Sequence, residues 1–185
     1  MGVLDLDYYY RTSGNYNSYH NYYRPNDNQR AVAYLKGGPL RPEIRGLVHF
    51  EDALGGTWVR VQVSGLPDYR PGSEGQNPIG PHGFHIHEYG SCDIGDRDQP
   101  FMSAGGHFNP YMQPHGNHAG DFPVLFSNNG RASMTFFTDK FKVNDIIGKA
   151  VIIHESPDDY RTQPAGDAGK RLACGIIERV GPAYS

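Results

Sequence analysis

Residues 83–121 concentrate side chains that bind metal ions. This stretch contains five of the nine histidines, one of the two cysteines and Asp121. His85 and His87 are separated by one residue, and side chains two apart on a β-strand point to the same face. Their imidazoles can therefore reach one point in space. Neutral imidazole is a good ligand for copper and zinc, so this pair is a candidate metal site.

A second group of potential ligands follows in a loop rich in Gly, Pro and Asn. It consists of His107, His115, His118 and Asp121. Three imidazoles and one carboxylate make a closed four-ligand zinc set. His154 ends the apolar segment AVIIH and enters a polar loop, which makes it another candidate ligand. This clustering favours a metal site over histidines scattered on the surface.

The rest of the sequence predicts an all-β domain that positions these ligands. Gly (24) and Pro (14) are abundant, aromatic residues make up 12% of the chain, and no long stretch has helical periodicity. In residues 57–64 three valines alternate with polar side chains, as in a strand with one buried face. We expect eight short strands, at 31–36, 44–50, 57–64, 83–89, 124–126, 132–138, 150–154 and 174–180. Such strands with long connections predict a Greek-key sandwich or flattened barrel.

The length of 185 residues suits one domain, which we place at residues 30–185. Residues 1–29 differ in composition, because seven tyrosines alternate there with polar residues and aliphatic side chains nearly vanish after Leu6. Such a segment buries too little apolar area to offset the entropy of ordering it. We therefore expect a flexible Tyr/Asn-rich tail, whose aromatic rings could contact an unknown partner.

Charge and composition exclude some functions and leave others open. The formal net charge of −3 gives no basic footprint for nucleic acid, and no apolar run is long enough to span a membrane. No secretory signal is visible in the first thirty residues, so we expect a cytoplasmic protein, one assembled at a cell surface by another route, or a processed form. Cys92 and Cys174 allow either one disulfide closing a long loop or two free thiols.

Six segments resemble the copper/zinc superoxide dismutase family in its bacterial form. They are AVAYLKGG, GFHIHEYGSC, SAGGHFNP, HGNHAGD, GKAVIIHESPDDY and AGKRLACGII. The resemblance extends over residues 30–180. It implies an eight-stranded Greek-key barrel with long metal-binding and electrostatic loops. It also implies disproportionation of superoxide to dioxygen and hydrogen peroxide at a histidine-bridged copper–zinc site.

The resemblance further implies a role for each candidate residue. Copper would be bound by His85, His87, His107 and His154, and zinc by His107, His115, His118 and Asp121. His107 would bridge the metals and deliver a proton to the product. Asp158 would orient one ligand of each metal, Cys92 and Cys174 would form a disulfide, and Arg171 would dock the superoxide anion beside copper.

Two other classes of protein remain as alternatives. One is a dismutase-like module that does not turn over and serves as a metal store or a surface structural protein. The other is a cupin, which also has a His-x-His pair, but the Glu expected four to five residues after the second His is absent, and no His follows Asp121 until His154. We interpret His82 as structural or exposed and His49 as exposed. A homodimer is compatible with the sequence.

Overall fold

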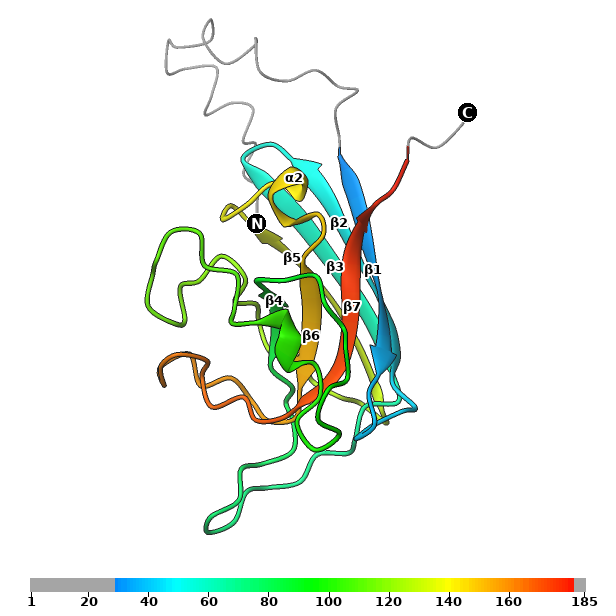
Figure 1. Ribbon diagram of the computed structural model, residues 1–185, viewed down its shortest axis with the longest axis vertical. Coiled ribbons are helices and arrows are strands. Elements are labelled where there is room, and N and C mark those ends of the chain that lie inside the picture. Colours follow the sequence, from blue (N-terminus) through cyan, green and yellow to red (C-terminus); the bar gives the residue numbers. More distant parts are fainter. Residues whose placement is uncertain (1–28, 182–185) are drawn as a thin grey trace, which may run out of the picture.

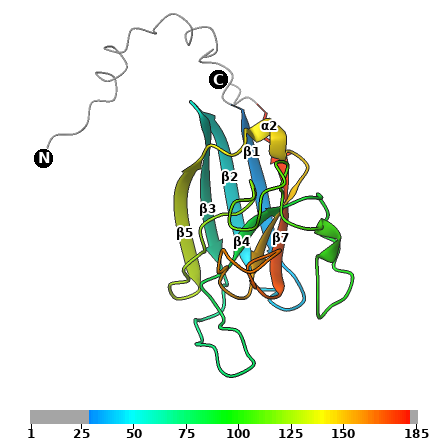
Figure 2. The same ribbon diagram turned by 90° about the vertical axis from the view of Figure 1, so that its left-hand side faces the viewer.

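Seven antiparallel strands form one sheet that curls on itself, as Figures 1 and 2 show. The computed structural model describes residues 29–181, so the expected tail lies almost entirely outside the described residues. The strands are β1 (Arg30–Gly37), β2 (Arg45–Ala53), β3 (Gly56–Ser64), β4 (Phe84–His87), β5 (Arg131–Thr138), β6 (Ala150–His154) and β7 (Arg171–Arg179). Their spatial order is β4-β6-β7-β1-β2-β3-β5. Two short helical segments, η1 (Met102–Ala104) and α2 (Val143–Ile146), lie in the connections.

Side-chain alternation fills the inside of the curled sheet. On β3 the three valines are buried while Arg60 and Gln62 are exposed, as the sequence pattern predicted. His49 is exposed on β2, which is also as expected. The largest fully buried side chains are Phe50, Phe84, Phe122, Leu35, Ile44, Ile86, Leu125, Ile146, Ile152, Ile153, Leu172 and Ile177. Burial of this apolar surface is the main force that holds the sheet closed.

The strand expected at 124–126 is not a regular strand, and that expectation was wrong. Pro123 has no backbone N–H to donate to a ladder, which explains why pairing there is limited. Leu125 nevertheless exchanges two backbone hydrogen bonds with His82, just before β4. At the other end Asn128 pairs with Arg131 through a turn in which Asn129 and Gly130 have positive φ. This tight turn was predicted, and the segment links the two edges of the sheet.

Long loops cover the outer face of β4 and build the candidate site there. Phe84 and Ile86 point into the core, so His85 and His87 face outward beneath these loops. Figure 1 shows the loops after β4 and between β6 and β7 on the same side of the sheet. A disulfide between Cys92 and Cys174, with the two Cα atoms 5.7 Å apart, ties the first loop to β7. Within residues 29–181 no helix is long and apolar enough to cross a membrane.

Candidate metal centre

The structure gathers the candidate ligands into two groups that share one residue. In each group one ligand atom per residue lies within 4.8 Å of the others. The first group is His85, His87, His107 and His154, and the second is His107, His115, His118 and Asp121. Strands β4 and β6 supply three of these residues, and the loop after β4 supplies the others. His107 is therefore a member of both sets of four ligands.

Hydrogen bonds in the first group leave one nitrogen of each imidazole free to bind a metal. His85 donates from Nε2 to Asp158 Oδ2 at 2.6 Å, and its buried Nδ1 has no hydrogen-bond partner. His87 donates from Nδ1 to the Gly105 carbonyl at 3.1 Å, and His154 donates from Nδ1 to the Gly169 carbonyl at 3.3 Å. The Nε2 atoms of His87 and His154 then face each other at 3.2 Å. Lone pairs that converge in this way fit a cation, and imidazole nitrogens suit copper.

The second group is arranged around the Asp121 carboxylate. Nδ1 of His107 is 2.9 Å from Oδ1, Nδ1 of His115 is 3.3 Å from Oδ2, and Nδ1 of His118 is 3.4 Å from Oδ1. The backbone N–H groups of Gly116 and His118 also donate to Oδ2. Nδ1 of His115 and of His118 is buried and has no hydrogen-bond partner. Three nitrogens and one carboxylate fit the donor set of a zinc ion.

His107 connects the groups through its two ring nitrogens. Its Nδ1 faces Asp121, while its Nε2 is buried without a hydrogen-bond partner. Its ring centroid lies 3.9 Å from that of His85. A single imidazole thus presents one nitrogen to each group, the geometry required of a bridging ligand.

Asp158 connects the groups on the side opposite the free Nδ1 atoms of His85 and His115. Its Oδ2 accepts from His85 Nε2, and its Oδ1 accepts from His115 Nε2 at 2.8 Å and from the backbone N–H of Tyr160 at 2.7 Å. Asp158 is buried, so these bonds form where water does not compete. One carboxylate therefore fixes the tautomer and ring orientation of one histidine in each group.

The surroundings of His85, His87 and His154 favour the neutral form of these side chains, which is the form that binds metals. Burial lowers the pKa of His85 and His87 well below the ordinary value, and neighbouring histidines add to this effect. Burial likewise lowers the pKa of His154 to about 3. Burial alone would raise the pKa of Asp121, but the hydrogen bond from His107 and the nearby imidazoles lower it below the ordinary carboxyl value.

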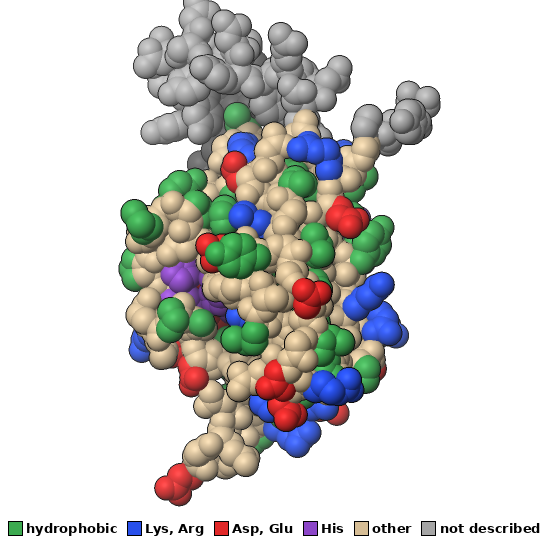
Figure 3. All heavy atoms as spheres, in the orientation of Figure 1, with side chains coloured by type: hydrophobic (Ala, Val, Ile, Leu, Met, Phe, Trp, Pro, Cys, Tyr) green, Lys and Arg blue, Asp and Glu red, His purple; other side chains and the backbone are tan. Residues whose placement is uncertain are grey.

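Arg171 lies next to the first group. Its guanidinium donates to the carbonyls of Phe101 at 2.6 Å and Gly105 at 2.7 Å, and burial lowers its pKa. His87 donates to the same Gly105 carbonyl, so the guanidinium lies close to this imidazole, and its positive charge contributes to lowering the pKa of His87 and His154. In Figure 3 histidine side chains are visible at the surface, between the surrounding loops.

Comparison with known proteins agrees with this geometry. The family model described as copper/zinc superoxide dismutase (SODC) matches residues 44–177. The chain belongs to the copper/zinc superoxide dismutase family. It is 34% identical to "Superoxide dismutase [Cu-Zn]" of Deinococcus radiodurans, over 75% of this chain and 79% of the relative. It is 37% identical to "Superoxide dismutase [Cu-Zn] 2" of Aquifex aeolicus, over 73% and 80%.

A solved structure supports the same family and the barrel fold. The copper/zinc superoxide dismutase from Brucella abortus superimposes with a TM-score of 0.65 at 31% identity, covering 80% of this chain and 99% of that one. The Greek-key barrel expected from the sequence is thereby confirmed. The copper and zinc expected of this dismutase family have matching donor sets in the two groups.

Two further residues support the metal centre of this dismutase, and the sequence analysis gave neither of them that role. His82, which was interpreted as structural or exposed, is fully buried, and its Nδ1 lies 2.9 Å from the His154 carbonyl oxygen. The Gln163 side chain accepts from the His115 N–H at 2.8 Å and donates to the His115 carbonyl at 3.3 Å. Gln163 occurs in a polar loop without periodicity, so no signal in the sequence marks it. Its role becomes visible only when the loop between β6 and β7 packs against the loop after β4, which carries His115.

Proposed function

We propose that this chain disproportionates superoxide to dioxygen and hydrogen peroxide. In this proposal copper is bound by His85, His87, His107 and His154, and zinc by His107, His115, His118 and Asp121. The observation that supports it best is that His107 belongs to both groups. Copper with imidazole ligands supplies reversible one-electron transfer between two superoxide ions, whereas zinc has no redox chemistry and fixes the structure.

Arg171 is proposed to dock the anionic substrate. Two carbonyls hold its guanidinium in place, and the planar fork has five N–H donors, so donors remain for an anion. The chain as a whole has a formal charge of −3, so attraction of superoxide has to be local. A fixed positive charge beside a partly desolvated pocket provides such focusing.

His107 is proposed to supply a proton. Its Nε2 has no partner among the described residues, while its Nδ1 stays against Asp121. When Nε2 is not bound to copper it could hold a proton, which would pass to superoxide as that ion is reduced, and solvent would supply the second proton of hydrogen peroxide. Asp158 contributes by keeping His85 and His115 in the tautomers that leave their Nδ1 atoms free.

The proposal is tested by metal analysis together with a superoxide-consumption assay on purified protein supplied with both metals. We expect about one copper and one zinc per chain, as the two groups require, and rapid consumption of superoxide. A single metal per chain would refute the bridged pair. Two metals without consumption would favour the non-catalytic module, which the complete ligand set and Arg171 argue against.

We also propose that residues 1–29 are a flexible tail separate from a catalytic domain at 30–185. The composition of the tail supports this, and its tyrosines would be available to an unknown partner. Removing the tail should leave the melting temperature and activity nearly unchanged. Sedimentation of both forms will also report whether the domain is a homodimer. A drop of several degrees in melting temperature on truncation would contradict the proposed separation.

A further inference from the structure

Away from the metal centre, β1, β2, β3 and β5 present an outer face on which positive charge is unbalanced. Their register aligns outward side chains into four rows across the sheet. From one end, the rows are Lys36-Arg45-Ser64-Arg131, Tyr34-Leu47-Gln62-Ser133, Val32-His49-Arg60-Thr135 and Arg30-Glu51-Trp58-Phe137. We call these sixteen positions the four-strand face. They hold five Lys or Arg side chains and one acidic side chain, although the whole chain is net acidic.

The single acid on the four-strand face is already paired. Glu51 forms a salt bridge with Arg30 at 2.7 Å. Between residues 29 and 181, no acidic partner is recorded for the other four cations, Lys36, Arg45, Arg60 and Arg131, all of which are exposed. Lys36 and Arg45 stand directly opposite each other, an arrangement of like charges that destabilises a sheet. The face therefore carries positive charge that its own side chains do not neutralise.

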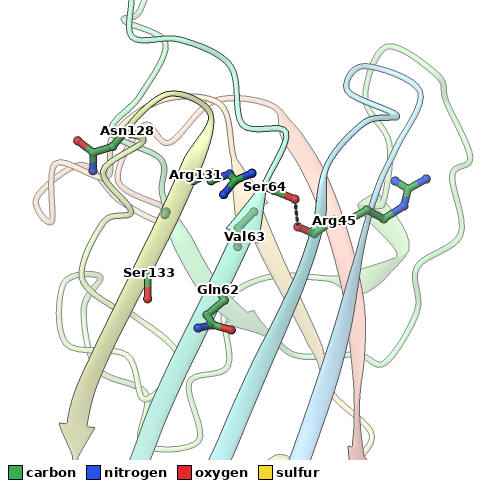
Figure 4. Close-up of a pocket in the computed structure, with 8 residues that line it drawn as sticks. Arg45, Gln62, Val63, Ser64, Asn128, Arg131 and Ser133 are labelled. Carbon is green, nitrogen blue, oxygen red and sulfur yellow. Dashed lines mark hydrogen bonds between the residues drawn. The ribbon is translucent and has the colours of Figure 1, made fainter.

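Arg45, Ser64 and Arg131 of the first row line a depression of about 580 Å³ at one end of the four-strand face. Figure 4 shows the depression, with Arg131 on β5 reaching toward Ser64 on β3 and Arg45 extending from β2. Ser64 Oγ donates to the Arg45 carbonyl, and Arg45 Nη1 donates to the carbonyls of Pro42 and Ile44, which restrains that guanidinium. Gln62, Ser133 and Asn128 add uncharged hydrogen-bonding groups.

We propose that the four-strand face binds a carboxylated polysaccharide. With about 4.8 Å between strands and about 3.3 Å per residue, the four unpaired cations span roughly 14 Å across the strands and roughly 13 Å along them, on the outer surface of the sheet. Arginine pairs with carboxylate through two parallel hydrogen bonds, and amide and hydroxyl side chains between the cations can bond sugar hydroxyls. Duplex DNA has one charge per about 1.7 Å, and four cations spread over this area match that charge density poorly.

The single tryptophan makes this proposal directly measurable. Trp58 lies on the four-strand face, 49% exposed, with its ring centroid 5.4 Å from that of Phe137. Ligand binding at this face should therefore change tryptophan fluorescence. Titration of the full-length, metal-loaded protein with alginate oligomers should give a saturable change, and uncharged dextran should give none.

Two charge-matched double variants test where the polysaccharide binds. Arg45→Gln/Arg131→Gln should raise the Kd at least about tenfold and reduce the salt dependence of binding. Arg70→Gln/Arg97→Gln removes the same charge from exposed loop positions and should leave the Kd within about twofold. If Arg45→Gln/Arg131→Gln lowers the melting temperature, the binding test is made instead with Lys36→Gln/Arg60→Gln, which removes two charges from the same face.

Three outcomes would overturn the proposal. The first is no saturable binding of alginate, and the second is equal weakening by the sheet pair and the loop pair. The third is tighter binding of a short DNA duplex or an acidic protein than of alginate at the same salt concentration, which would assign the face to another partner. Superoxide consumption should be the same in all these variants, so a failure here does not bear on the dismutase proposal.

Discussion

Arg171 and His87 donate hydrogen bonds to the same carbonyl oxygen, that of Gly105. The distances are 2.7 Å from Arg171 Nη2 and 3.1 Å from His87 Nδ1. One backbone group therefore sets both the position of the guanidinium and the tautomer of an imidazole in the first ligand group. The disulfide at Cys92 anchors the loop that carries Gly105. The loop after β4 thus positions both the Arg171 guanidinium and the His87 imidazole.

Replacing Arg171 by Ala should slow the reaction with superoxide by roughly one to two orders of magnitude, because electrostatic focusing is lost. Both metals should remain bound, since arginine is not a ligand. The rate of Arg171→Lys should lie between those of wild type and Arg171→Ala, because lysine keeps the charge but not the planar fork. Stopped-flow rates at rising ionic strength should decline for wild type and much less for the Ala variant. Equal rates and equal salt dependence would show that Arg171 guides no substrate.

Asp158→Asn should weaken zinc binding by roughly 10–100-fold, because an amide cannot accept from both His85 and His115 as a carboxylate does. Chelator competition on the purified protein measures the affinity. Asp167→Asn is a suitable control, since Asp167 is exposed and its carboxylate accepts from Asn77 on the surface. A loss of zinc affinity of the same size in both variants would argue against a specific role for Asp158.

Tyr160→Phe should destabilise the protein by about 0.5–1.5 kcal/mol and lower the melting temperature by a few degrees. The Tyr160 hydroxyl donates to the Phe122 carbonyl at 3.0 Å and accepts from the Val124 N–H at 2.9 Å. It therefore fixes the segment that follows Asp121. Thermal melts should show no such change for Tyr69→Phe, because Tyr69 is 63% exposed.

Removing the disulfide should cost about 4.5 kcal/mol on the chain-entropy account, because Cys92 and Cys174 close a loop with a sequence separation of 82. Denaturant unfolding of Cys92→Ser/Cys174→Ser against wild type measures the difference. Thiol counting on denatured, unreduced wild-type protein provides an independent check. Two titratable thiols per chain would mean that the bond is not formed in solution.

We expect Asp159 to contribute to the stability of the folded protein in a way that depends on pH. Its carboxylate accepts from the backbone N–H groups of Arg161 and Thr162 and from the Thr162 hydroxyl, and these bonds lower its pKa from 3.8 to about 2. Because the folded-state pKa is depressed, the contribution is present above pH 3.8 and is lost as the pH falls through about 2.

The stability difference between wild type and Asp159→Asn should therefore shrink as the pH is lowered over this range. Urea melts at several pH values measure it, and Asp68→Asn is a control at another exposed loop position. A difference that does not vary with pH would show that ionisation of Asp159 is not involved.

The sequence by itself identified the residues that the structure gathers into two ligand groups. Alternation on a strand is a local property, so it placed His85 and His87 on one face without any knowledge of the fold. The same alternation predicted the buried face of β3, and Asn129 and Gly130 predicted the tight turn, because each depends only on neighbouring residues. The family segments added the remaining roles as expectations.

Only the tertiary structure decided which nitrogen of each histidine is free. That choice depends on acceptors distant in sequence, such as Asp158 for His85 and the Gly105 carbonyl for His87. The rows of the four-strand face likewise exist only once strand register is set. The burial of His82 belongs to the same class. In each case the deciding contact joins segments far apart in the chain, and local sequence preferences do not encode it.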